Sequence, residues 1–172
     1  PPLELEDDYR RCSDKYELPI LAGGWFYVLG RDEDLLMENL RLGARLGSLV
    51  HNTQIIMDHQ DGSLVSDEQV VEIYLRAYET GEACGCRPTF EVHVNMWSED
   101  FRRIEKVADL VEKQGIPFRM TLDHSHVIFK IDNPREQEVF NIRESIENGD
   151  LVLDPFQDNH CLLYTSDAAD EH

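Results

Sequence analysis

Basic residues are scarce in this sequence, and their scarcity argues against one class of partner. The 172 residues contain 16 Lys and Arg against 35 Asp and Glu, which gives a formal net charge of −19. Nucleic-acid backbones are bound through Lys and Arg, so we expect no nucleic-acid partner. Long apolar runs are missing as well. Since none approaches the length of a membrane-spanning helix, we expect no association with a membrane.

Two kinds of motif are also missing, namely glycine-rich phosphate loops and cysteine frameworks. No Gly-x-Gly-x-x-Gly follows a strand and no Gly-x-x-x-x-Gly-Lys occurs, so the usual signals of a nucleotide-binding sheet are lacking. Of the four cysteines, Cys84 and Cys86 are separated by one residue, and no Cys-x-x-Cys zinc pair is present. Because no disulfide framework is visible, a reducing cytoplasm is the compartment that we expect.

Both ends of the chain differ from those of a typical natural protein. The sequence begins with PPLELEDDYRR and has no initiating Met, from which we expect that an upstream part is missing. The segment CLLYTSDAADE (161–171) resembles one reading frame of the adapter used in transposon-based sequencing libraries. We therefore assign residues 1–160 to one natural domain and treat residues 161–172 as a non-native tail.

The body of the chain alternates regularly between two patterns. Runs with strand-like patterning occupy residues 19–28, 49–57, 88–97 and a segment that begins at residue 117. Each run is followed by a stretch with helical periodicity, and these stretches cover residues 32–47, 66–81, 98–115 and 133–149. Strand and helix thus alternate at a pitch of about thirty residues, which predicts an α/β fold with parallel strands.

Capping signals predict where the helices begin and end. Ser66 and Gln69 stand at the spacing of a capping box, and Ser98 is a typical N-cap. Asn133 is another N-cap candidate, because Pro134 follows it at the first helical position. Glycine is typical just after a helix, and the predicted helices end at Gly47, Gly81, Gly115 and Gly149.

Polar side chains gather near the carboxyl ends of the predicted strands. Glu91 and His93 are spaced by two residues, so they share one face of their strand. Asp123 and His126 follow the next strand, and His51 lies in the preceding one. An acid that faces a parallel sheet is costly without a partner, and a metal ion would offset that cost. In a closed barrel the carboxyl ends of the strands converge at one mouth, where active sites lie.

FEVHVNMW (90–97), followed by a helix and then LDHSHV (122–127), resembles the xylose-isomerase-like barrel superfamily, which includes sugar phosphate isomerases and epimerases. The resemblance covers residues 19–150 and implies a partial (β/α)8 TIM barrel, roughly strands two to five with their helices. It implies that Glu91 and Asp123 bind one divalent metal and that His126 contacts substrate. The family's sixth-strand histidine and eighth-strand glutamate, its other metal ligands, have no counterpart before the chain ends.

The resemblance also implies a chemistry. We expect Glu91 and Asp123 to hold Mn²⁺, Mg²⁺, Co²⁺ or Zn²⁺, with Glu91 and His126 as the catalytic residues. The metal would activate a carbohydrate-like substrate for isomerisation or epimerisation through an enediolate. The residues expected to contact substrate are His126, His51, His93 and Trp97.

Three alternatives stay open at this point. A dehydratase of the same superfamily shares the first proton abstraction, and a non-catalytic barrel module would use the mouth only for binding. A metal-dependent endonuclease would use the same residue types, but the acidic charge argues against it. We expect the fragment itself to be inactive, and a homo-oligomer of the full-length protein is left open.

Overall fold

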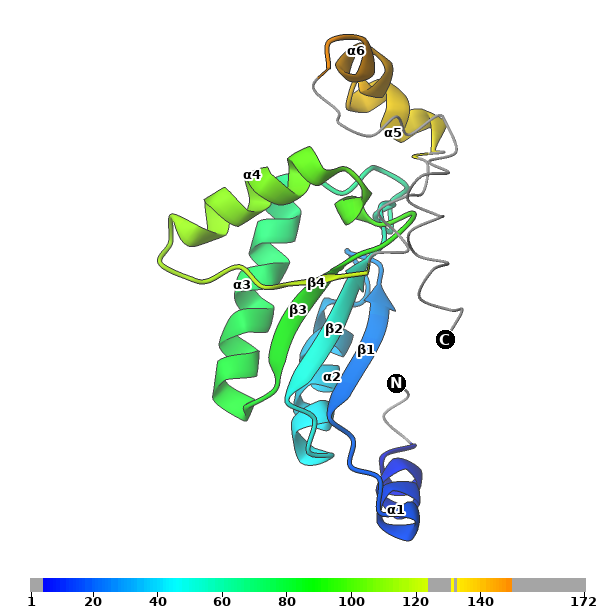
Figure 1. The fold of residues 1–172 in the computed structure, drawn as a ribbon, viewed down its shortest axis with the longest axis vertical. Helices are drawn as coiled ribbons and strands as arrows, with labels where there is room; N and C mark the ends of the chain where they lie inside the picture. The colour runs from blue at the N-terminus through cyan, green and yellow to red at the C-terminus, as the bar shows by residue number, and fades with distance from the viewer. Residues whose placement is uncertain (1–4, 124–130, 132, 150–172) are drawn as a thin grey trace, which may run out of the picture.

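A computed structural model describes residues 5–123, 131 and 133–149 (Figure 1). Four strands in these ranges form one sheet in the order β1-β2-β3-β4, and every neighbouring pair is parallel. The strands are β1 (Ala22–Tyr27), β2 (Val50–Ile55), β3 (Arg87–Val92) and β4 (Met120–Leu122). The predicted α/β fold with parallel strands that alternate with helices is therefore confirmed for the described part of the chain.

Three helices connect the strands and cover one face of the sheet. They are α2 (Glu33–Arg45), α3 (Asp67–Cys84) and α4 (Phe101–Glu112), with the short 3-10 helix η2 (Trp97–Glu99) just before α4. They lie side by side, with α3 between α2 and α4 (Figure 1). No helix in the described ranges combines the length and apolar character that crossing a membrane requires.

Further helices lie at the two ends of the sheet (Figure 1). Helix α1 (Glu6–Tyr16) lies at the amino-terminal end of the strands, where Glu6 forms an ion pair of 2.8 Å with Arg45 at the end of α2. Helices α5 (Pro134–Val139) and α6 (Ile142–Glu147) lie beyond the opposite end. The α5–α6 segment contacts α4, because Arg102 donates to the carbonyl of Phe140 at 3.2 Å.

The two faces of the sheet differ in character. Tyr27, Ile55 and Phe90 lie on the helix-covered face, where they are fully buried in one core with residues of α2, α3 and α4. Because successive residues of a strand point to opposite faces, Asn52 and Glu91 lie on the other face. That second face is polar along β2, β3 and β4, and the described helices do not cover it.

Helix α3 confirms one predicted boundary and corrects another. The capping box is present, since Ser66 accepts from the backbone of Gln69 and the Gln69 side chain accepts from the backbone of Ser66. The predicted end at Gly81 is wrong, because α3 continues to Cys84. Gly81 is needed for a different reason: a Cβ there would lie 2.6 Å from Cδ of Pro88, where the chain enters β3.

The later helices also depart from the predicted boundaries. Helix α4 is capped by Asp100, which accepts from the backbone N–H of Arg102 at 3.0 Å, and the prediction of Ser98 as its cap is wrong. The start of α5 is confirmed, with Asn133 as N-cap and Pro134 in the first turn. The single helix expected over 133–149 is instead two helices, which are separated at Asn141, a residue with a left-handed φ of 50°.

Candidate functional site

Glu91 is the centre of the polar face. Its side chain is only 6% exposed, and its Oε2 accepts a hydrogen bond of 2.7 Å from Nδ2 of Asn52. The same Oε2 accepts a second, short hydrogen bond from Nε2 of Gln54. Both amides lie on β2 with a spacing of two residues, so one face of β2 presents two N–H donors to one carboxylate oxygen of β3.

The backbone of Glu91 is held as well. Its carbonyl accepts a hydrogen bond of 2.5 Å from Oγ of Ser98, a buried residue in η2. Within the described ranges no residue donates a hydrogen bond to Oε1 of Glu91. One oxygen of the carboxylate is therefore fixed by two amides, and the other retains its lone pairs for a cation or a proton.

Asp123 directly follows β4, the strand that pairs with β3. Thr121 on β4 is the register partner of Glu91 on β3. The Thr121 hydroxyl lies 2.8 Å from the hydroxyl of Thr89, on the same face of the sheet as Glu91. Asp123 is two residues beyond Thr121 and is half-buried. The two carboxyl residues that the sequence nominated for a metal thus belong to neighbouring parallel strands at their carboxyl ends.

His51 lies on the opposite face of β2 from Asn52, under the helices. It is 1% exposed, and its Nε2 lies 2.6 Å from the hydroxyl of Tyr27. Asn39 also donates to that hydroxyl, at 2.9 Å, so Asn39, Tyr27 and His51 form one buried hydrogen-bonded set. Burial lowers the pKa of His51 to about 4, so the imidazole is neutral at pH 7. The structure does not bring His51 together with Glu91.

The other nominated residues have different surroundings. His93 is the first residue after β3, and its Nδ1 lies 2.8 Å from the carbonyl of Val94. Trp97 is fully buried in the core, where its ring packs edge-on against Phe90 with centroids 6.4 Å apart. Trp97 is therefore an interior residue of the core. His126 lies outside the described residues.

The sequence reasoning did not nominate Asn52 and Gln54, although a signal for them was present. Strand alternation places residues 52 and 54 on one face and residue 51 on the other. In the register, Thr53 pairs with Phe90, which aligns Gln54 with Glu91. The nomination of His51 followed a family position. Alternation gives the face of Asn52 and Gln54, and the register between β2 and β3 then brings them to Glu91.

The donor set suits a hard divalent cation, but it is incomplete in the described part of the chain. Glu91 and Asp123 supply carboxylate oxygens, which are the ligands that Mg²⁺ and Mn²⁺ prefer. No group of three or more His, Cys, Asp and Glu side chains lies close enough to hold a metal among the described residues. Any further ligands would come from outside these ranges.

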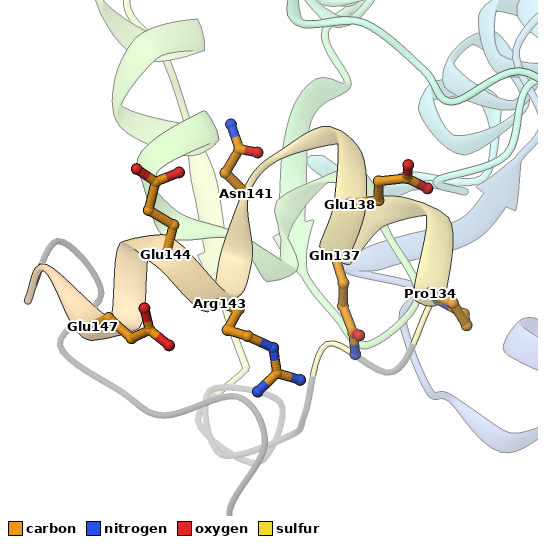
Figure 2. Close-up of a pocket in the computed structure, with 7 residues that line it drawn as sticks. All are labelled: Pro134, Gln137, Glu138, Asn141, Arg143, Glu144 and Glu147. Atoms are coloured by element: carbon orange, nitrogen blue, oxygen red, sulfur yellow. The ribbon is translucent and has the colours of Figure 1, made fainter.

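A separate hollow lies on the α5–α6 segment, away from Glu91. Figure 2 shows that its side chains fan outward from the two short helices and do not converge on one point. It is lined by Pro134, Gln137, Glu138, Asn141, Arg143, Glu144 and Glu147. This hollow therefore lacks a convergence of donors such as that on Oε2 of Glu91.

No protein-family model matches the sequence, and no curated protein matches it either. The geometry around Glu91 is therefore the basis for a functional conclusion.

Proposed function

We propose that this chain is part of a divalent-metal-dependent isomerase or epimerase that acts on a carbohydrate-like substrate through an enediolate. The observation that supports this proposal best is the environment of Glu91. A nearly buried carboxylate is held through one oxygen by two amides on the polar face of a parallel sheet. Asp123, a second carboxylate, ends the next strand.

The arrangement of the sheet supports a barrel rather than an open sheet with helices on both faces. Each strand pairs with the next one in the sequence, and α2, α3 and α4 lie on the same face (Figure 1). Doubly wound sheets cover both faces with helices, whereas a (β/α)8 barrel covers only its outside. On this proposal the polar face that carries Glu91 is the inside of the barrel.

Glu91 and Asp123 would hold the metal, which when bound supplies polarisation of a substrate carbonyl and its neighbouring hydroxyl. The amides of Asn52 and Gln54 hold Oε2 of Glu91 in place through two hydrogen bonds. Oε1, to which no described residue donates a hydrogen bond, would be the oxygen available to the cation or to the proton removed from the substrate carbon. His126 is proposed to hydrogen-bond the substrate oxygen.

The metal half of the proposal is tested by calorimetry with Mn²⁺ on the complete gene product. Asp123→Asn should weaken binding because an amide lacks the charge of a carboxylate, and Glu91→Gln should weaken it for the same reason. Arg76→Met on the exposed outer side of α3 is the control and should bind Mn²⁺ as the unaltered protein does. Unchanged affinity in both site variants would remove the metal site.

The reaction half is tested by isotope exchange. An enediolate mechanism takes a proton from carbon and returns one, so a ketose that turns over in D₂O should acquire deuterium at the carbon beside its carbonyl. Glu91→Gln should abolish this exchange even at saturating Mn²⁺. Product formation without deuterium uptake, across a panel of ketoses and their phosphates, would contradict proton abstraction.

A further inference from the structure

We propose that Asn52 and Gln54 are positioning residues for Glu91, and that they set the affinity of the site for its divalent cation. This inference rests on the proposed function, because it concerns how Glu91 is prepared to bind the metal. It goes beyond that function by assigning a role to two residues of β2 that do not bind the metal themselves.

The hydrogen bonds converge on one atom. Nδ2 of Asn52 and Nε2 of Gln54 both donate to Oε2 of Glu91, the first at 2.7 Å and the second at short range. All three residues belong to the two central strands of the sheet, which are less free to move than loops. Two N–H groups directed at one carboxylate oxygen restrain rotation of the Glu91 carboxylate.

Asn52 and Gln54 lie at different levels along the strands relative to Glu91. Gln54 lies level with Glu91, because Thr53 is the register partner of Phe90. Asn52 is paired with Thr89, one step deeper on the same face and farther from the carboxyl ends of the strands. Asn52 therefore donates from a level nearer the amino-terminal ends of the strands and Gln54 from the level of Glu91 itself, and both donate to Oε2.

A second asparagine whose Nδ2 donates one hydrogen bond provides a comparison. Asn39 on α2 is 1% exposed and uses its Nδ2 to donate one hydrogen bond, at 2.9 Å, to Tyr27. Both Asn39 and Asn52 have a buried Oδ1 without a hydrogen-bond partner. The Nδ2 of the buried Asn39 thus donates to a phenol in the core, whereas the Nδ2 of the half-buried Asn52 donates to the Glu91 carboxylate.

The experiment measures Mn²⁺ affinity and melting temperature of the complete protein for Asn52→Leu, Gln54→Leu and Asn39→Leu. Partners that orient a metal ligand are typically worth a factor of about 10 to 100 in affinity. We expect a loss of about tenfold or more for Asn52→Leu and for Gln54→Leu. Asn39→Leu should lower the melting temperature and leave the affinity unchanged, which separates positioning from a merely structural contribution.

A double-mutant cycle tests whether Gln54 acts through Glu91. If it does, Gln54→Leu should cause no further loss of Mn²⁺ affinity once Glu91→Gln is present. Additive losses would mean that Gln54 meets the cation directly, and they would overturn the positioning role.

The outcomes also separate this inference from the proposed function. If Glu91→Gln binds Mn²⁺ as tightly as the unaltered protein, the proposed function fails and the inference fails with it. If Glu91→Gln loses Mn²⁺ while Asn52→Leu and Gln54→Leu retain full affinity, the metal site stands and the positioning inference alone is overturned.

Discussion

Arg103 should be among the most important single residues for stability. It is 3% exposed, and its Nε donates to the buried carboxylate of Asp67 at 2.7 Å. Its Nη2 donates to the carbonyl of Val65 at 2.7 Å, and its guanidinium lies 4.4 Å from the centre of the Phe140 ring. Arg103 thus joins α4 to the start of α3 and to the α5–α6 segment.

Replacing Arg103 with Met keeps most of the volume and removes every one of these polar contacts. Breaking a buried ion pair typically costs about 3–5 kcal/mol, because the remaining charge stays buried. Asp67 would keep one partner, since Nζ of Lys106 lies 2.7 Å from its Oδ2. We therefore expect the lower part of that range, about 3 kcal/mol of unfolding free energy.

Urea denaturation of Arg103→Met, with Arg76→Met as the control, measures this cost. Arg76 forms an exposed ion pair of 3.2 Å with Asp34, and exposed pairs contribute little. Arg76→Met should therefore unfold at nearly the same urea concentration as the unaltered protein. Equal midpoints for the two variants would refute the conclusion that the Arg103 network fastens α4 in place.

Two further predictions concern the packing of α3 and the buried imidazole. Gly81→Ala should destabilise the protein by about 1–3 kcal/mol, because the added Cβ would lie 2.6 Å from Pro88 and 2.7 Å from the Cys86 carbonyl; an unchanged melting temperature would contradict this close approach. His51 has a pKa of about 4 in the folded protein, against 6.5 when exposed. Between about pH 4 and pH 6.5 the imidazole is therefore protonated in the unfolded chain and neutral in the folded protein. The free energy of unfolding should therefore fall by about 3 kcal/mol as pH drops from about 6.5 to about 4. The His51→Gln variant should not show this loss. Parallel curves of stability against pH for the two proteins would argue against a buried neutral imidazole.

The sequence predicted those parts of the fold that depend on interactions between residues near each other in the chain. The alternation of strand and helix, the capping box at Ser66 and the start of α5 at Asn133 each follow from residues that are neighbours in sequence. Gly81 shows the limit of such reasoning. Its position suggested a helix end, but its small size is required by contact with Pro88, which another element supplies.

The candidate site also contains residues that the sequence predicted and residues that it did not. Glu91 and Asp123 were nominated from the sequence, and they lie at the ends of adjacent parallel strands. The roles of Asn52 and Gln54 depend on the register between β2 and β3, which no local pattern specifies. His51 was nominated from a family position, whereas strand alternation turns its side chain toward the helices and into contact with Tyr27.

The central claim is that Glu91 and Asp123 share one divalent cation at the carboxyl ends of β3 and β4. Anomalous diffraction from crystals of the complete protein grown with Mn²⁺ would test it most directly, because the signal locates the ion without assuming a ligand set. The proposal predicts a peak in contact with the carboxylates of Glu91 and Asp123, and a weaker peak in Glu91→Gln crystals grown at the same Mn²⁺ concentration. Manganese bound elsewhere, with neither carboxylate in contact, would contradict it.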